Sequence, residues 1–300
     1  MVMEKEVADS IDSPLEGIFS SSASLYSNLL PREQSSQQPG AHKIGMVLSG
    51  GGARGALEVG AMKVILKKIM PDLIIGTSIG SINGAFVASG GTADELEEIW
   101  LHVSRRLLFP RNFSLFFKLF KAESMSKNIN LKEILQRVMK KEHFEDCAIP
   151  LYINATRLSD GDSIFFNKGN IIDAVMASCA IPPLYPPYSI DGIHYLDGGV
   201  STSNGVKKAV DLGCDTIIVL DSSNTKRMFN FEGIFDVTRH AFHIMFRKSL
   251  LNEIARCHDR RIILISCQNV DVAVNDFSRT AELIRLGEKA ASEILDDFEF

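Results

Sequence analysis

The chain has 300 residues, of which 45% are hydrophobic and 23% charged, and its formal net charge at pH 7 is −5. This is the composition of an ordinary globular protein, and the acidic balance argues against nucleic-acid binding, which needs a concentrated basic face. The five cysteines include no C-x-x-C pair, which excludes zinc-ribbon and thioredoxin-type motifs and predicts reduced, buried thiols.

The first segment, residues 1–42, is rich in serine and glutamine. Such a segment has too little apolar surface to offset the entropy lost on ordering, so we expect a flexible leader. Acidic residues, Glu4, Glu6 and Asp9, stand where a signal peptide would be apolar, and no apolar run approaches the roughly 20 residues of a membrane-spanning helix. We therefore expect a cytoplasmic protein with one folded domain, residues 43–300.

The folded part begins with an apolar run, Ile44–Leu48, which predicts a buried strand. The sequence S-G-G-G-A-R-G follows and leads into a helical pattern. The three adjacent glycines, Gly50, Gly51 and Gly52, let several backbone N–H groups point at one place, and the start of the helix adds positive potential there. The loop therefore suits an anion or the developing oxyanion of acyl transfer.

The same loop also satisfies the dinucleotide-binding pattern G-x-G-x-x-G, through Gly50, Gly52 and Gly55. A nucleotide site of that type requires an acidic residue at the end of the second strand. The second predicted strand, Leu73–Ile75, is followed instead by G-T-S at residues 76–78. The nucleotide alternative is therefore the weaker one.

A G-x-S-x-G motif with Ser78 at its centre lies between this second strand and another helical pattern. In a nucleophile elbow the serine lies on a strained strand-to-helix turn, and small residues such as Gly76 and Gly80 relieve the crowding. A serine before a helix is alternatively a simple N-cap. The glycine loop one strand upstream favours the elbow, because acyl transfer needs both a nucleophile and oxyanion donors.

The fold class follows from these two strand–turn–helix units, which imply parallel strands joined by crossovers. We expect an α/β protein, a three-layer α/β/α sandwich with a mainly parallel central sheet. Later strands are predicted at Leu151–Thr156, Ser163–Phe166, Ile193–Leu196, Thr216–Leu220 and Ile262–Ser266. Later helices are predicted at residues 93–104, 130–141, 170–179, 204–212, 234–257 and 278–297. The D-G pairs at 160–161 and 191–192 are typical of turns.

An aromatic segment, residues 109–121, lies between the elbow helix and the central strands. As a helix it would place four phenylalanines on one face, with basic residues at the borders, which suits an anionic lipid surface. The same pattern is also typical of an amphipathic helix that covers the core, and helices of this kind are the more common of the two. Our hypothesis is that the segment lines or gates a groove for an acyl chain.

The base that would activate Ser78 is not a clear histidine. An α/β-hydrolase triad has the order Ser, Asp or Glu, His. His240 and His243 lie in a helical pattern without further metal ligands nearby, and His194 has no evident orienting partner. A conventional Ser-His-Asp esterase, with a histidine from the C-terminal part of the chain as the base, stays the alternative.

Asp197 is the better candidate for the base. It ends a predicted strand and is followed by Gly198 and Gly199, which permit a sharp turn that holds the carboxylate at the sheet edge. The reference pKa of aspartate is about 3.9, against about 6.5 for histidine, and desolvation returns part of this difference. We therefore predict slow turnover on soluble esters by a Ser78–Asp197 dyad.

Together these motifs resemble those of the patatin-like phospholipases, which show G-G-G-x-R-G, G-x-S-x-G and D-G-G or D-G-A in this order. The three motifs occupy residues 50–55, 76–80 and 197–199. The proline-rich stretch 178–187 also resembles the family, and the resemblance is clear over residues 43–222. One departure is Gly205, where the family often has proline, which puts the rigidity of the following helix start in question.

The resemblance implies a lipid acyl hydrolase that cleaves ester bonds of phospholipids or related lipids through an acyl-serine intermediate. Ser78 would be the nucleophile and Asp197 its base. The oxyanion hole would be formed by the glycine loop with Arg54 in the family's arginine position, and no metal or cofactor is implied. The expected partners are the lipid substrate and, transiently, a membrane surface. A catalytically weak lipid-binding protein of the same fold is the remaining alternative.

Overall fold

The computed structural model of the chain describes residues 42–102, 129–182, 185–201, 204–223, 234–267, 270 and 272–296. These residues all lie in one compact unit, Gly40–Phe300. The predicted leader, residues 1–42, lies outside the described residues except for its last position, so its boundary stays a prediction. The aromatic segment 109–121 also lies outside them.

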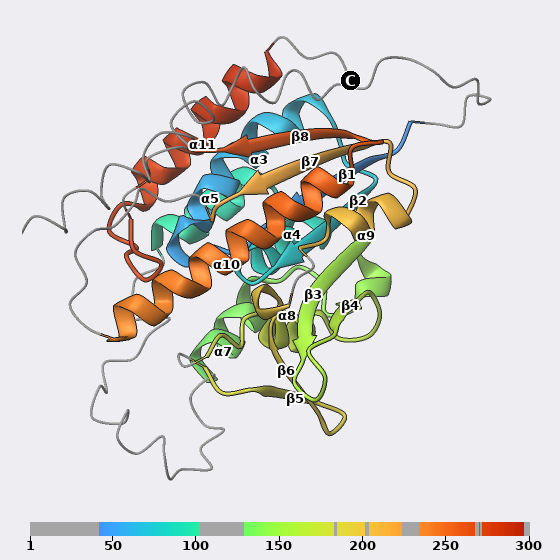
Figure 1. The fold of residues 1–300 in the computed structure, drawn as a ribbon. Coiled ribbons are helices and arrows are strands. Elements are labelled where there is room, and N and C mark those ends of the chain that lie inside the picture. Colours follow the sequence, from blue (N-terminus) through green and yellow to red (C-terminus); the bar gives the residue numbers. More distant parts are fainter. Residues whose placement is uncertain are drawn as a thin grey trace, which may run out of the picture. The chain divides into compact units, whose positions relative to one another are not determined.

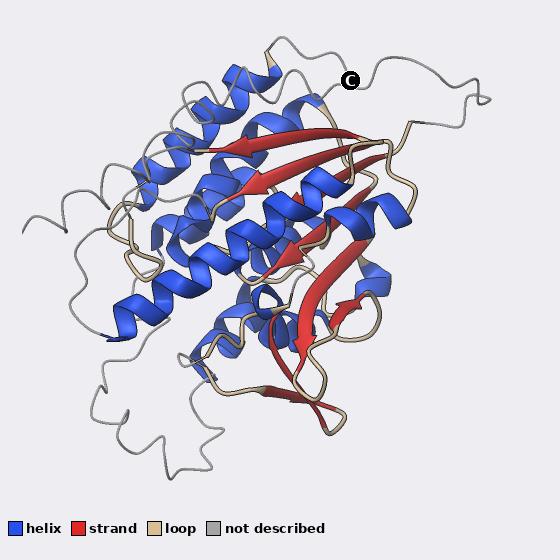
Figure 2. Ribbon diagram, in the orientation of Figure 1, coloured by secondary structure: helices blue, strands red, loops and turns tan. Residues whose placement is uncertain are grey.

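A mainly parallel sheet forms the centre of the fold (Figures 1 and 2). Its parallel strands, in spatial order, are β3 (Leu151–Arg157), β2 (Leu73–Thr77), β1 (Ile44–Leu48), β7 (Thr216–Asp221) and β8 (Arg261–Ser266). Its antiparallel strands, all at the β3 end, are β4 (Ser163–Phe166), β5 (Tyr188–Ile190) and β6 (Ile193–Asp197). Strands β1, β2 and β7 are buried along their whole length, as expected for parallel strands that helices cover on both faces.

Helices cover both faces of this sheet and divide the core into two parts. One face packs against α3 (Ala56–Lys68), α4 (Ile79–Ala88), α5 (Ala93–His102), α7 (Ile129–Val138), α8 (Ile171–Ser178) and α11 (Thr280–Leu295). The other packs against α9 (Val206–Asp211) and α10 (Ile234–Arg256), which crosses the near face of the sheet in Figure 1. Strand β1 serves both parts, because Met46 and Leu48 point to the first and Val47 to the second. The predicted three-layer α/β/α sandwich is confirmed.

Most predicted elements are present, and their ends differ from the predicted ones by at most three residues. Short 3-10 turns add η1 (Gly52–Gly55), η3 (Phe144–Asp146) and η4 (Gly198–Val200). The D-G pair at 160–161 joins β3 to β4, and the pair Asp191-Gly192 joins β5 to β6 with positive φ angles of 51° and 79°. Strand β5 was not predicted, because its three residues follow a proline-rich stretch and carry no clear alternation.

Strands β2 and β6 run toward each other along one edge of β3. On β3, β2 pairs with residues 151–154, β4 with 153–156 and β6 with 155–157. Because β4 overlaps both of the others, it occupies one edge of β3, and β2 and β6 share the opposite edge. Thr77 at the end of β2 pairs with Asn154, and Asp197 at the end of β6 pairs with Ala155. The residue that follows β2, Ser78, is therefore brought close to Asp197.

Candidate active site

Ser78 lies on a strained turn between β2 and α4. Its φ of 54° and ψ of −124° are conformations that a residue with a side chain rarely adopts. The turn is closely packed: a Cβ on Gly76 would lie 2.5 Å from the carbonyl oxygen of Gly80, and one on Gly80 would lie 2.6 Å from that of Leu48. These contacts explain why glycine stands at both flanking positions of the motif.

The turn is held by hydrogen bonds on both sides of Ser78. The backbone N–H of Ser78 donates to Ser178 Oγ (2.8 Å), and Ser178 Oγ donates to the carbonyl oxygen of Asn154 on β3 (2.7 Å). The carbonyl oxygen of Ser78 accepts from the backbone N–H (2.9 Å) and the hydroxyl (2.6 Å) of Ser81. The strained backbone is therefore fixed by its surroundings, as a nucleophile elbow requires.

Ser78 and Asp197 are in direct contact. Ser78 Oγ donates a hydrogen bond to Asp197 Oδ2 at 2.6 Å, and the backbone N–H of Gly199 donates to Asp197 Oδ1 at 2.8 Å. Thr156 on β3 donates its hydroxyl to the carbonyl oxygen of Asp197 at 2.9 Å. The carboxylate is thus oriented by the turn that follows β6, which is the arrangement expected from the doubled glycine.

Asp197 is buried, with only 2% of its surface exposed. Burial raises the pKa of Asp197 to about 6, although the hydrogen bonds from Ser78 and Gly199 act in the opposite direction. A carboxylate with this pKa is a better proton acceptor than an exposed aspartate and is still mostly ionised at pH 7. A serine–aspartate dyad would require a desolvated carboxyl group of this kind.

The glycine loop lies beside Ser78. A Cβ on Gly50 would lie 3.2 Å from Ser78 Cβ, so the loop backbone approaches the serine as closely as packing allows. Gly52 has a φ of 59°, and a Cβ there would overlap the carbonyl oxygen of Val274. Within the part of the chain that the structure describes, nothing accepts a hydrogen bond from the N–H of Gly50, Gly51 or Gly52. These N–H groups are the ones suited to stabilise an oxyanion.

Arg54 braces the loop from inside. It is buried, and both its backbone N–H and its Nε donate to the carbonyl oxygen of Gly51 at 3.3 Å. Its Nη2 lies 3.0 Å from Nδ1 of His243 on α10. Arg54 was expected in the glycine loop, whereas His243 stands in an ordinary helical pattern and was not predicted to contact it. No sequence signal connects positions 54 and 243, because only the packing of α10 brings them together.

Phe246, also on α10, covers the same loop and the turn after Asp197. A Cβ on Gly50 would lie 3.3 Å from Phe246 Cζ, and one on Gly199 would lie 2.7 Å from Phe246 Cδ2. The phenyl ring packs closely on both glycines, so a side chain at either position would require the ring to shift. Phe246 stands in an ordinary helical pattern, and no sequence signal marks this contact.

The histidines do not form a triad among the residues that the structure describes. In that set, the hydroxyl of Ser78 has its hydrogen bond with Asp197 and none with a histidine. His194 is exposed on β6, and His243 faces Arg54. The described residues also include no group of three or more His, Cys, Asp or Glu side chains placed to hold a metal ion.

A sequence model of the patatin-like phospholipases matches residues 46–210, more than half of the chain. The chain belongs to this family. It is a family of ester-bond hydrolases, and the matched range contains the glycine loop, Ser78 and Asp197. The sequence match and the contacts between the three motifs in the structure therefore point to the same site.

Similar patatin-like proteins include two fungal enzymes. Lysophospholipase NTE1 of Coccidioides immitis is 30% identical over 179 residues, which are 59% of this chain and 11% of that protein. Lysophospholipase nte1 of Aspergillus terreus is 29% identical over 179 residues, which are 59% of this chain and 12% of that protein. The chain thus spans about a tenth of the length of these relatives.

Two solved structures are also similar to this chain. VipD from Legionella pneumophila has a TM-score of 0.47 at 13% identity, over 85% of this chain and 67% of that one. ExoU, in its complex with SpcU from Pseudomonas aeruginosa, has a TM-score of 0.41 at 15% identity, over 85% of this chain and 51% of that one. Both TM-scores are below 0.5, and the family assignment rests on the sequence match.

Gly205 departs from the patatin-like pattern without loosening the structure. Its φ of 100° cannot be adopted by proline, and a Cβ there would lie 2.6 Å from Ile75 Cγ2. The start of α9 is fixed by Glu253 of α10, which accepts hydrogen bonds from the backbone N–H of Asn204 (2.6 Å) and Lys207 (2.8 Å). A carboxylate at a helix start is favourable, so the rigidity that proline would supply comes from α10 instead.

Proposed function

We propose that this patatin-like chain hydrolyses acyl ester bonds of phospholipids or lysophospholipids through an acyl-serine intermediate formed on Ser78. The main support is the 2.6 Å hydrogen bond from Ser78 Oγ to Asp197 Oδ2, with the glycine loop beside it. The two fungal relatives are lysophospholipases, which supports lysophospholipids as the first substrates to test.

In the proposed reaction Asp197 Oδ2 takes the proton of Ser78 as Oγ bonds to the ester carbonyl carbon. The carbonyl oxygen becomes an oxyanion, which the N–H groups of Gly50, Gly51 and Gly52 stabilise. Collapse of this intermediate breaks the ester C–O bond, and the leaving alcohol receives the proton from Asp197. Water then repeats the sequence on the acyl-serine and releases the fatty acid and free Ser78.

The contacts of Ser78 favour this dyad over a Ser-His-Asp triad. Single replacement of His194, His240 and His243 by alanine separates the two mechanisms. We expect the rate of ester hydrolysis to stay within about tenfold of wild type in all three, because positioned general bases contribute 10²–10⁴-fold. A thousandfold loss in one of them would identify a catalytic histidine. His243 has the largest expected effect of the three, since it contacts Arg54.

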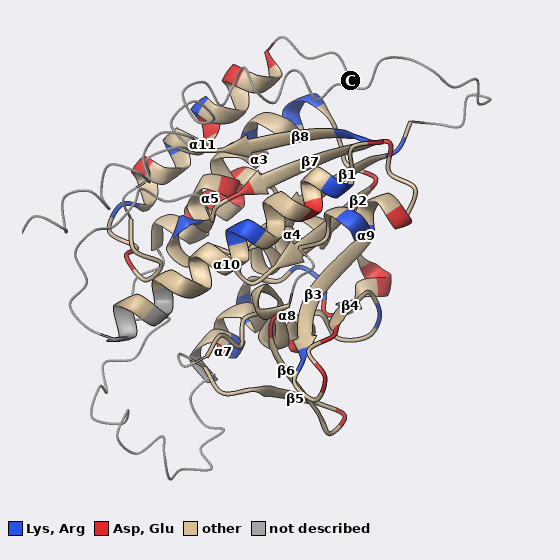
Figure 3. Ribbon diagram, in the orientation of Figure 1, with Lys and Arg blue, Asp and Glu red and all other residues tan. Residues whose placement is uncertain are grey.

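A transient contact with a lipid surface is the second part of the proposal. Three large apolar side chains are exposed on α10, Val237 (45%), Ile244 (50%) and Met245 (62%), and Lys248 next to them is also exposed. Val237 and Ile244 lie on the side of the helix opposite Phe246 and Met245 lies on its flank, and Figure 3 shows basic positions on α10. Apolar residues with basic neighbours suit an anionic lipid interface. No helix among the described residues is long and apolar enough to cross a membrane.

Binding to vesicles of anionic phospholipid tests this contact. We expect Ile244→Asp and Met245→Asp to reduce co-sedimentation with the vesicles, whereas Leu158→Asp, a matched control at a 47% exposed site outside α10, leaves it unchanged. Equal binding of all variants would contradict the contact and leave the ester chemistry untouched. A cytoplasmic location stays a prediction.

A lipid panel tests the ester chemistry. Wild type and Ser78→Ala are incubated with phospholipids and lysophospholipids, and the released fatty acids are measured by mass spectrometry. We expect release by wild type only, together with labelling by a fluorophosphonate probe that Ser78→Ala abolishes. A folded wild-type protein that neither labels nor releases fatty acid would instead be a lipid-binding protein that retains the fold.

A further inference from the structure

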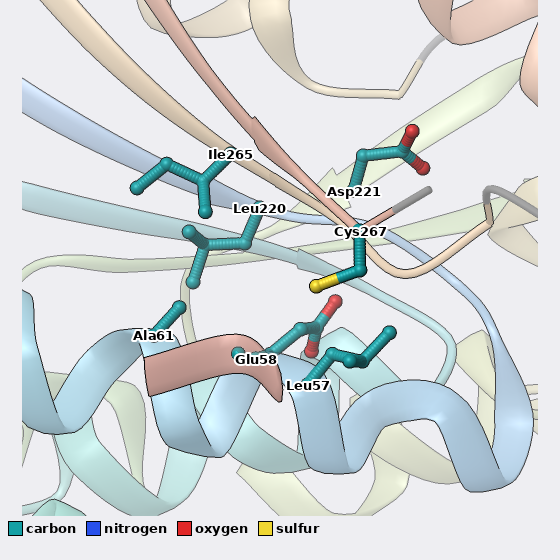
Figure 4. Close-up of a pocket in the computed structure, with 8 residues that line it drawn as sticks. Leu57, Glu58, Ala61, Leu220, Asp221, Ile265 and Cys267 are labelled. Carbon is teal, nitrogen blue, oxygen red and sulfur yellow. The ribbon is translucent and has the colours of Figure 1, made fainter. Parts of the chain in front are cut away.

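Glu58 on α3 is a buried acid directly behind the glycine loop. Only 1% of its surface is exposed, and within the described residues it has no cationic partner. Its Oε2 accepts a hydrogen bond from Asn83 Nδ2 at 2.9 Å, and its Oε1 lies 3.1 Å from Ser222 Oγ. Figure 4 shows the side chain pointing from α3 toward the ends of β7 and β8, near Asp221 and Cys267.

The Ser222 contact leads to the beginning of the loop. The backbone N–H of Ser222 donates to Ser49 Oγ at 2.9 Å, and Ser49 immediately precedes Gly50. The loop also packs on Ser222 directly, because a Cβ on Gly51 would lie 2.5 Å from Ser222 Oγ. One oxygen of Glu58 is thus connected through a single residue to the start of the loop.

The Asn83 contact leads to the end of the loop. The Nδ2 group that donates to Glu58 also donates to the carbonyl oxygen of Gly55 at 3.1 Å. Asn83 cannot turn away from this position, because its Oδ1 accepts from Trp100 Nε1 at 2.9 Å and the residue is fully buried. The second oxygen of Glu58 is therefore connected through Asn83 to the last residue of the motif.

We propose that Glu58 is a positioning residue for acyl transfer, which holds both ends of the loop and thereby aims the N–H groups of Gly50, Gly51 and Gly52 at the oxyanion. This inference rests on the proposed function, because it concerns the same reaction. It assigns a role to a residue outside the three motifs, and it predicts an effect on the transition state rather than on substrate binding.

The state of the Glu58 carboxyl group fits this role. Burial raises the pKa of Glu58 well above its usual value, although the hydrogen bonds from Asn83 and Ser222 oppose the shift, and the nearby Asp221 adds to it. Both carboxyl oxygens accept hydrogen bonds in this network, Oε1 from Ser222 Oγ and Oε2 from Asn83 Nδ2. The amide of glutamine keeps nearly the same shape: its oxygen can accept from Asn83, and its NH2 group can donate to Ser222 Oγ once that hydroxyl turns. Leucine offers neither contact.

The test compares Glu58→Gln with Glu58→Leu on a soluble p-nitrophenyl ester. We expect Glu58→Leu to lower kcat roughly 10- to 100-fold, with KM changed less than about threefold. The N–H groups of the loop would no longer be oriented toward the oxyanion, whereas the surface that binds substrate would be unchanged. Glu58→Gln should recover most of the lost kcat. The rate of fluorophosphonate labelling should follow kcat in both variants.

Two results would overturn the role of Glu58. One is a folded Glu58→Leu variant with wild-type kcat, and the other is a Glu58→Gln variant that is as slow as Glu58→Leu. If Glu58→Leu does not fold, Ser222→Ala removes one arm of the network without adding bulk, and wild-type kcat in that variant would equally contradict the proposal. Failure of the proposed function is distinguishable, because wild type itself would then show no turnover that depends on Ser78.

Discussion

The two residues of the proposed dyad are placed by opposite physical means. Ser78 is half-buried in a backbone conformation that is strained, with a φ of 54°. Asp197 has an ordinary backbone conformation, with a φ of −48°, but its carboxyl group is buried and its pKa is raised to about 6. The serine therefore contributes backbone strain and the aspartate contributes desolvation, and each effect opposes folding.

This difference teaches that the site lowers the stability of the fold at two neighbouring positions by two different physical effects. Strain at Ser78 presents the hydroxyl at the end of β2, and desolvation at Asp197 increases the proton affinity of the carboxylate. Residues that serve catalysis at the expense of folding give gains in stability when they are replaced by a suitable side chain. Replacements at each position should therefore lower activity and raise stability, and they should do so with different dependence on pH.

The largest effect is expected for Asp197→Asn. Asparagine keeps the shape and can still bond to Ser78 and Gly199, but it cannot take a proton, so we expect kcat to fall by about a thousandfold or more. Turnover of a soluble ester by wild type and variant measures the loss. Asp191→Asn, on the β5–β6 hairpin that leads to Asp197, is the matched control and should keep wild-type kcat, because Asp191 is exposed at the turn.

The same variant should be more stable than wild type at neutral pH. Because the folded protein holds the proton of Asp197 more tightly than the unfolded chain does, this group favours folding at low pH. That contribution is lost as pH rises from about 4 through about 6. Above pH 6 we expect Asp197→Asn to unfold with a free energy higher by on the order of 1–3 kcal/mol, and the difference should vanish near pH 4. A variant that is less stable at pH 8 would contradict the desolvation.

The pH dependence of kcat is the next effect in size. The base must be ionised, so activity should rise with pH and reach a plateau above about 6, where Asp197 has lost its proton. Below that value each pH unit should lower kcat about tenfold, which gives roughly a hundredfold loss at pH 4. Rates on a soluble ester between pH 4 and 8 measure the midpoint. A plateau that extends unchanged below pH 5 would show that Asp197 is not the base.

Much of the site was predictable because its motifs are local in sequence. The glycine loop, Ser78 and Asp197 each follow a strand, and parallel strands bring their ends to one edge of a sheet. The contact between Ser78 and Asp197 has a less obvious cause, since β6 runs antiparallel to β3 and meets the end of β2. The sequence indicates that Asp197 ends a strand, but it does not indicate the edge of β3 on which that strand lies.

The parts that sequence reasoning missed depend on contacts between distant elements. His243 and Phe246 come from α10, which is about 190 residues from the loop that they contact. Glu58 stands in an ordinary helical pattern, and only its burial against Ser222 and Asn83 makes it notable. Local periodicity predicts which face of a helix is buried, but not which element it will meet.

The smallest of these effects, a comparison at Ser78, isolates the backbone strain. Ser78→Ala and Ser78→Gly should both abolish hydrolysis, because neither has a hydroxyl, so their activities cannot differ. Their stabilities should differ, since alanine keeps the Cβ that makes a φ of 54° unfavourable and glycine does not. We expect Ser78→Gly to be more stable than Ser78→Ala by about 1 kcal/mol, or roughly 2–4 °C in Tm.

The matched pair is Ser81→Gly and Ser81→Ala in the first turn of α4, where the glycine variant should be the less stable one by about 0.5–1 kcal/mol. The opposite sign at two positions three residues apart is the signature of local strain, because a general effect of glycine on the unfolded chain would lower stability at both.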